Sequence, residues 1–207
     1  MHQRPSESQI NRARIVLESL IANKRISLTI ASAYKLPFPE NYYDGVCIFC
    51  VLEHINNPLA ALNEARRVLK SGGILYCTEV FNSGLYIYPD CPTISGYWAV
   101  FNQCQIGMGG DPDIGMKLVN LAARAGFKQI NFHDVSSTFD RRIASKPQRI
   151  EFLNFWKLLF LSASDNLISE GKIMPEVVLK LHEEFDNLTE NLDAAFSYAG
   201  KQIEYYK

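Results

Sequence analysis

The clearest pattern in the chain is an apolar segment, then a helical repeat, then a second apolar segment. Residues 46–51 are apolar throughout and β-branched at both ends, which is typical of a strand covered on both faces. The dipeptide Asn57-Pro58 predicts a helix start, and the glycine pair at residues 72–73 predicts its end. Residues 74–80 read as a further strand. This spacing predicts a βαβ unit with a right-handed crossover.

Two elements are predicted before this unit. Ser6 and Gln9 form a capping-box pattern that predicts the start of an amphipathic helix. Its apolar face consists of Ile10, Ala13, Leu17, Leu20 and Ile21. Ile26–Ile30 alternates apolar and polar residues, so we expect a strand near the edge of a sheet.

After the unit the pattern becomes less regular. Residues 81–108 are rich in Gly, Pro, Tyr and Asn and predict a long loop with at most a short helix. The remaining predicted elements are a helix from Asp111-Pro112 to Gly126, a strand at 127–135, helices at 148–170 and 175–192, and a closing strand at 196–206. With no repeat or linker, one domain over residues 1–207 is expected.

Composition narrows the class of protein. The 207 residues are 47% hydrophobic and 21% charged, as in ordinary globular chains. A net charge of −1 argues against nucleic-acid binding, which needs a basic excess. No apolar run approaches the roughly eighteen residues of a membrane span, and residues 1–5 lack a secretory pattern, so a cytoplasmic location is expected.

The five cysteines form an odd number without framework spacing, which is typical of free thiols. Cys47 and Cys50 form a C-x-x-C string, but residues three apart on a strand point to opposite faces. They are therefore expected to be buried small apolar residues, and no metal site is predicted.

Three strings of the sequence suggest a family. They are LPFPEN at 36–41, VLEH at 51–54 and RVLKSGG at 67–73. In this order and spacing they resemble the cofactor domain of class I S-adenosylmethionine-dependent methyltransferases, most nearly the small-molecule enzymes similar to ubiquinone/menaquinone C-methyltransferases. The resemblance implies a Rossmann-like α/β three-layer sandwich, S-adenosylmethionine as cofactor and a small-molecule acceptor.

The same resemblance predicts a fold truncated at its N-terminus. The glycine-rich loop and the ribose-binding acid of this family do not occur upstream of residue 36. Residues 26–30, 46–51 and 74–80 resemble the third, fourth and fifth strands, so the first two strands, which lie between the third and the fourth, are expected to be absent. Then either 26–30 pairs with 46–51 or one side of 46–51 stays open. A homodimer, a partner chain completing the sheet, or an incomplete reading frame would account for this.

The resemblance also implies cofactor-binding residues. Ser32 stands where the family has an acid that accepts a hydrogen bond from the adenine amino group, and a hydroxyl accepts it more weakly. The alternative for Ser32 is a polar turn residue. Ala33 and Leu36 would pack beside the adenine. Cys50 and Val51, at the end of the fourth strand, would contact the adenosine–methionine region, with Cys50 acting through its backbone.

Catalytic residues are left open, with weak candidates in His54, Glu53 and Glu79. His54 could orient the methyl donor or act as a base. Alternatively, His54 and Glu53 shape the turn after the strand, and Glu79 is an exposed acid at a strand end. The chain divides into a partial cofactor-binding core at 1–81, an acceptor-side loop at 82–115 and C-terminal helices and strands at 116–207.

Aromatic residues of the acceptor-side segment could line an apolar pocket or pack the segment onto the core; they are Tyr86, Tyr88, Tyr97, Trp98 and Phe101. Two functions remain open. One is S-adenosylmethionine-dependent transfer to a carbon, oxygen or nitrogen acceptor. The other is a non-catalytic methyltransferase-like binding or regulatory subunit.

Overall fold

The computed structural model describes residues 7–143 and 145–207, so the predicted helix start at Ser6 lies outside the described part. In chain order the elements are α1 (Glu7–Val16), α2 (Glu18–Ala22), β1 (Tyr43–Phe49), the 3-10 turn η1 (Leu52–His54), α3 (Pro58–Val68), β2 (Leu69–Val80), η2 (Asn82–Gly84), β3 (Tyr86–Tyr88), α4 (Pro92–Gly107), η3 (Ile114–Lys117), α5 (Leu118–Arg124), β4 (Lys128–Asp134), β5 (Ser137–Phe139), α6 (Lys146–Leu161), α7 (Ser164–Ser169), α8 (Pro175–Glu190), β6 (Ala195–Tyr198) and β7 (Gly200–Tyr206).

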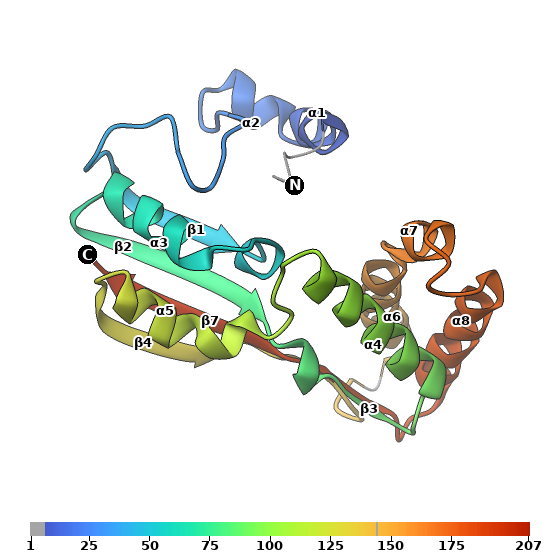
Figure 1. Cartoon of the computed structure of the whole chain (residues 1–207). Coiled ribbons are helices and arrows are strands. Elements are labelled where there is room, and N and C mark those ends of the chain that lie inside the picture. Colours follow the sequence, from blue (N-terminus) through green and yellow to red (C-terminus); the bar gives the residue numbers. More distant parts are fainter. Residues whose placement is uncertain (1–6, 144) are drawn as a thin grey trace.

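A four-stranded mixed sheet in the order β1-β2-β7-β4 forms the centre of the fold (Figure 1). β1 and β2 are parallel, and β7 runs antiparallel to both β2 and β4. A small antiparallel sheet, β3-β6-β5, continues from one end. The predicted βαβ unit, the strand at 127–135 and the closing strand are confirmed. The α/β fold is Rossmann-like, as expected.

The helix of the βαβ unit begins where the sequence predicts it. The Asn57 side chain accepts a hydrogen bond from the Ala60 N–H at 3.1 Å, and Pro58 occupies the first turn. The predicted stop at the glycine pair is wrong. α3 ends at Val68, and β2 begins directly at Leu69, which pairs with Tyr43. Gly72 lies inside β2 with a φ of 77°, where its missing side chain permits an irregularity in the strand.

One face of the sheet is covered and the other is open. α3 and α5 pack on the covered face through a hydrophobic cluster that includes Leu62, Leu75 and Leu118 (Figure 1). On the opposite face the Phe49 side chain is 72% exposed. Cys47 is exposed there too and Cys50 is only partly buried, so the prediction that both cysteines are buried is wrong. The prediction that residues 46–51 are covered on both faces is therefore wrong within the described chain, because no described helix packs against Phe49.

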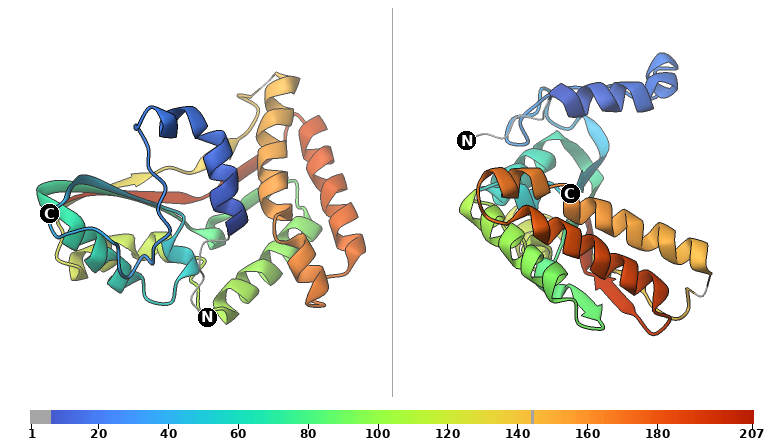
Figure 2. Two further views of the ribbon diagram at one scale, coloured as in Figure 1. Left: turned by 90° about the horizontal axis from the view of Figure 1, so that it is seen from above. Right: turned by 90° about the vertical axis from the view of Figure 1, so that its right-hand side faces the viewer.

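The segment before β1 differs most from expectation. Ile26–Ile30 is irregular rather than a strand, so the described chain leaves the outer edge of β1 unpaired. The residues of the predicted apolar face of the first helix are only half-buried, and Ile15 is 76% exposed. Figure 1 and the right-hand view of Figure 2 show α1 and α2 outside the layers formed by the sheet, α3 and α5. Alternation alone does not make a strand without a neighbour that satisfies its backbone groups.

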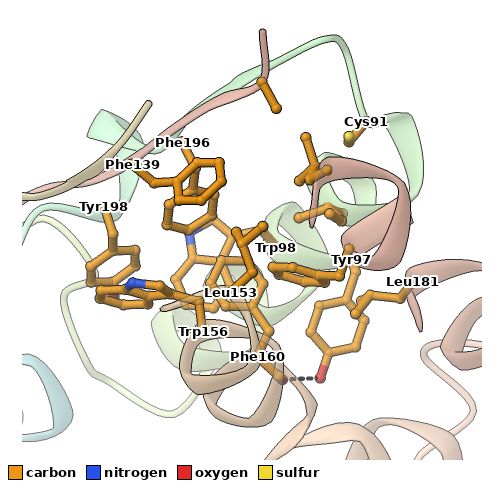
Figure 3. Close-up of a cluster of buried hydrophobic side chains, with 14 of the residues drawn as sticks. Cys91, Tyr97, Trp98, Phe139, Leu153, Trp156, Phe160, Leu181, Phe196 and Tyr198 are labelled. Atoms are coloured by element: carbon orange, nitrogen blue, oxygen red, sulfur yellow. Dashed lines mark hydrogen bonds between the residues drawn. The ribbon is translucent and has the colours of Figure 1, made fainter. Parts of the chain in front are cut away.

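A second hydrophobic cluster joins α4, α6 and α8 beside the small sheet (Figure 3). The Trp98 and Phe160 rings stack with centroids 4.1 Å apart, and the Tyr97 hydroxyl donates to the Phe160 carbonyl at 2.7 Å. The predicted loop over 81–108 is therefore wrong, since it contains the sixteen-residue helix α4. The Glu184 carboxylate of α8 accepts the N–H groups of Thr93 and Ile94 and caps that helix.

The helices near the C-terminus follow the sequence with one change. The predicted helix at 148–170 is divided into α6 and α7, and the predicted helix at 175–192 is α8. Gly171, with a φ of 65°, lies between α7 and α8. None of the helices in the described ranges is long and apolar enough to cross a membrane.

Arg149 fixes the end of α8 against α6. Its buried guanidinium donates to the carbonyls of Thr189 at 3.1 Å, Leu188 at 3.2 Å and Ile143 at 3.2 Å. It also lies over the Phe139 ring, 4.3 Å from the centroid. The positive charge therefore faces the carbonyl end of a helix, which is the favourable end for a cation.

We predict that Arg149→Met lowers the free energy of unfolding by about 3 kcal/mol, because several buried carbonyls lose their donors. Arg149→Lys should fall between this variant and the wild type, since an ammonium cannot reproduce the planar fork. Urea unfolding measures the effect. The control is Arg141→Met, which removes an exposed arginine and should change the value by less than about 1 kcal/mol. Equal effects of Arg149→Met and Arg141→Met would contradict the prediction.

Candidate functional site

The candidate site begins where β1 ends. Cys50 has a φ of 49°, in the left-handed region, and its N–H donates to the Thr78 carbonyl at 2.9 Å. The chain then turns sharply into η1. Leu52 enters the cluster under α3, whereas Cys50 packs against the cluster of α4, α6 and α8. The turn therefore lies where the two hydrophobic clusters meet, at the carboxyl ends of β1 and β2 (Figure 1).

Glu79 holds this turn from the side of β2. Its Oε1 accepts the N–H groups of Val51 at 3.0 Å and Leu52 at 2.8 Å, and its Oε2 accepts the Glu53 N–H at 3.3 Å. The side chain is completely buried, so the expectation of an exposed acid at a strand end does not hold. Burial raises the pKa of Glu79 to about 7, although the backbone donors act in the opposite direction.

The end of α4 holds the same turn from the other side. Gln105 Nε2 lies 2.9 Å from Glu53 Oε2 and 3.2 Å from the Glu53 carbonyl oxygen. The Asp111 N–H donates to that carbonyl at 2.9 Å. Glu53 is buried, whereas the His54 side chain is 44% exposed. Of the three catalytic candidates, only His54 therefore reaches the surface.

The loop before β1 lies beside the turn. The Tyr34 hydroxyl donates to Asn56 Oδ1 at 2.9 Å, and the Leu36 N–H donates to Glu64 Oε1 at 2.6 Å. Ser32 Oγ accepts the Tyr34 N–H at 3.2 Å. Tyr34 thus ties the Ser32 and Ala33 segment to the start of α3, a few residues after Cys50 and Val51. Leu36 is held farther along the same helix, by Glu64 and by Arg67 Nη2, which donates to the Leu36 carbonyl at 3.2 Å.

A series of hydrogen-bonded side chains near the turn could not be recognised from the sequence. The Tyr198 hydroxyl donates to Asn82 Oδ1 at 2.8 Å, and Asn82 Nδ2 donates to Asn102 Oδ1 at 2.8 Å. The three residues come from β6, η2 and α4. Tyr198 and Asn82 are 116 positions apart in the sequence. No local pattern could have brought Tyr198 to this edge.

The aromatic residues of segment 82–115 take different positions. Tyr97 and Trp98 are buried in the helical cluster, as the packing alternative predicts (Figure 3). Phe101 is partly buried and packs against the same cluster. Tyr86 and Tyr88 are exposed on β3. Among these five residues, the buried ones therefore serve the core rather than a pocket wall.

The residues at this edge would suit part of an adenosyl cofactor. Cys50 supplies backbone atoms, Val51 is partly exposed, and Ser32 has a hydroxyl on the surface. Burial raises the pKa of the Cys50 thiol to about 12, so it stays neutral and acts as an apolar contact. The carboxylates nearest the turn, Glu53 and Glu79, are engaged with the chain's own N–H groups. The fit is to the adenine side, without an acid for the ribose among these groups.

The first prediction for this site concerns pH. Folding raises the Glu79 pKa from an ordinary 4.5 to about 7, so the folded state favours the protonated form. Its contribution to stability is present below pH 4.5 and is lost as the pH rises through 7. Between pH 4.5 and 8, wild-type stability should fall relative to Glu79→Gln by about 2–3 kcal/mol. Urea unfolding across this range tests the prediction, with Glu151→Gln, at an exposed position of α6, as control. Parallel curves for wild type and Glu79→Gln would refute it.

The second prediction concerns Gly110. A Cβ at this position would lie 2.4 Å from the Glu53 carbonyl oxygen and 3.1 Å from the Gln105 carbonyl oxygen. Because both atoms belong to the backbone, Gly110→Ala should lower the free energy of unfolding by about 2 kcal/mol. Gly107→Ala is the matched control, since a Cβ there meets nothing within 4 Å. That variant should be neutral or stabilised by up to about 1 kcal/mol. Similar thermal shifts for both variants would contradict the prediction.

Comparison with known proteins finds similarity to methyltransferases. Residues 4–77 match the family described as "Methyltransferase domain". A methyltransferase of Schizosaccharomyces pombe is 33% identical over 65% of this chain and 50% of its own length. The ubiquinone/menaquinone biosynthesis C-methyltransferase of Chromobacterium violaceum is 40% identical over 34% of this chain and 27% of its own length.

The chain thus spans half the length, or less, of the curated relatives it matches. A solved structure from Bacillus halodurans, named as a methyltransferase, superposes with a TM-score of 0.57 at 16% identity, over 98% of this chain and 80% of that one. At that identity the superposition shows the fold alone. Sequence and fold agree that this chain resembles the class I S-adenosylmethionine-dependent methyltransferases, including the ubiquinone/menaquinone C-methyltransferases.

Proposed function

We propose that this chain serves S-adenosylmethionine-dependent methyl transfer to a small-molecule acceptor, at the carboxyl ends of β1 and β2. The observation that carries the proposal is the Cys50–His54 turn. In this turn Cys50 has a left-handed backbone conformation, and Glu79 accepts the N–H groups of Val51 and Leu52. The turn lies beside the loop that contains Ser32. Ligands of open α/β sheets bind at this end of the strands.

On the cofactor side, each of the five residues implied by the family resemblance would have a role. The Ser32 hydroxyl would accept a hydrogen bond from the adenine amino group, and Ala33 and Leu36 would pack beside the ring. The Cys50 backbone and Val51 would contact the rest of the donor. When bound, S-adenosylmethionine supplies a methyl group made electrophilic by the positively charged sulfur.

On the acceptor side, the available group is His54, with the buried Asn82 and Tyr198 and the half-buried Asn102 packed behind the site. His54 is the one catalytic candidate with an exposed side chain, since Glu53 and Glu79 are buried. Placing a nucleophile in line with the methyl group is a large contribution that such a site can make. Support for a small-molecule acceptor comes from the named activity of the Chromobacterium violaceum relative.

A second candidate is a non-catalytic methyltransferase-like binding or regulatory subunit. The observation that favours it is the engagement of Glu53 and Glu79 with the chain's own N–H groups. Neither carboxylate is then available to the ribose hydroxyls of a cofactor. Methyl transfer by the purified chain would refute this candidate.

Calorimetric titration with S-adenosylhomocysteine tests the proposed cofactor site. We expect a dissociation constant at or below about 100 μM, equivalent to about −5.5 kcal/mol. Adenosine serves as a second titrant that engages only the adenine and ribose positions. Absence of binding for both titrants would overturn the proposed cofactor site.

The Ser32 assignment makes a separate prediction. Ser32→Asp should tighten binding of S-adenosylhomocysteine by about threefold to tenfold, because a carboxylate accepts a charge-assisted hydrogen bond. Ser27→Asp adds the same charge to an exposed position in the irregular segment before the loop, and it should leave binding unchanged. Weaker binding for Ser32→Asp, or equal effects of both variants, would show that Ser32 is a turn residue only.

A further inference from the structure

Gln105 makes all of its side-chain contacts through one atom. Its Nε2 lies 2.9 Å from Glu53 Oε2, 3.2 Å from the Glu53 carbonyl oxygen and 3.2 Å from His54 Nδ1. Its Oε1 is buried and has no hydrogen-bond partner among the residues that the structure describes. This is an unusual arrangement, because leaving a buried carbonyl oxygen unpaired costs about 1–3 kcal/mol.

The neighbours of Gln105 decide which way its amide points. With the amide inverted, Oε1 would face two oxygen atoms of Glu53 and could accept a hydrogen bond from neither. The amino group must therefore face Glu53, even though this leaves Oε1 unpaired. The Glu53 backbone is held in place, because Glu79 accepts its N–H and the Asp111 N–H donates to its carbonyl.

This orientation determines the state of His54. The two amide hydrogens of Gln105 face three acceptors, so one hydrogen is shared between two of them. Because an amide nitrogen cannot accept a hydrogen bond, Nδ1 carries the lone pair and the proton of the neutral ring lies on Nε2. His54 Nε2 is 3.6 Å from Glu53 Oε1, which is longer than a hydrogen bond. The Nε2–H group is therefore not committed to Glu53, and the side chain is 44% exposed.

We propose that Gln105 is a positioning residue that selects the His54 tautomer in which Nδ1 accepts and Nε2 carries the proton. His54 then serves the site as a hydrogen-bond donor to an oxygen of the acceptor, and not as a base. The purpose of this arrangement rests on the proposed methyl transfer, but the state of the ring does not. It favours acceptors that present a carbonyl, enolate or phenolate oxygen to His54.

Nitrogen NMR of the full chain with labelled histidine tests the state of the ring directly. The sequence has four histidines, and the His54 signals are identified by their loss in His54→Gln. Of the two neutral tautomers, we expect the form with the proton on Nε2 to dominate. Dominance of the form with the proton on Nδ1 would overturn the proposal without any further variant.

Gln105→Met then tests the cause. It keeps the length of the side chain and removes the donor, so the His54 signals should shift toward a mixture of both tautomers. Gln103→Met is the matched control, because Gln103 is exposed on the same helix. Unchanged His54 signals in folded Gln105→Met would overturn the role of Gln105. If that variant does not fold, the wild-type spectrum alone decides, by the criterion already given.

Activity separates this proposal from the proposed function. With methyl transfer measured at saturating cofactor, Gln105→Met should slow the rate by about tenfold or more, and Gln103→Met should not. A chain without any methyl transfer would contradict the proposed function and leave the ring state of His54 as measured by NMR. If Gln105→Met shifts the tautomers of His54 but transfers methyl groups at the wild-type rate, then His54 is not part of the reaction.

Discussion

The hydrogen bonds between the Glu79 carboxylate and three consecutive backbone N–H groups are the constraint on which the candidate site depends. They join the end of β2 to the turn that follows β1. A buried carboxylate without such donors would be costly, and a turn with unpaired N–H groups would be costly as well. Each side of the contact therefore requires the other, which explains why an acid occurs at the buried end of β2.

The same turn depends on the helical half of the molecule. α4 reaches it through Gln105, Gly110 and Asp111, and α4 is itself capped by Glu184 of α8. Because Leu52 and Cys50 pack into different hydrophobic clusters, the turn lies between the sheet layer and the helices. A ligand at this edge would therefore contact both halves, and its polar contacts would come from segments distant in sequence.

The fold also leaves surfaces open. The face of the sheet that carries Cys47 and Phe49 is exposed, and α1 and α2 lie apart from it (Figure 2). The parallel pair β1-β2 is thus less completely covered than the parallel strands of most α/β proteins. The covered face and the site edge do not depend on these surfaces, since α3, α5 and Glu79 stabilise them from the other side.

The sequence by itself determined the βαβ unit, the cap at Asn57, the strands at residues 127–135 and near the C-terminus, and the family resemblance at residues 36–73. These features arise from local periodicity and from short motifs, which are visible without the fold. Only the tertiary structure decided that residues 92–107 are helical, that Ile26–Ile30 is not a strand, and that Gln105 and Tyr198 lie at the site. The physical reason is that the Glu184 cap, the missing strand partner and the contacts across the sheet all join residues far apart in the chain, so no local pattern encodes them.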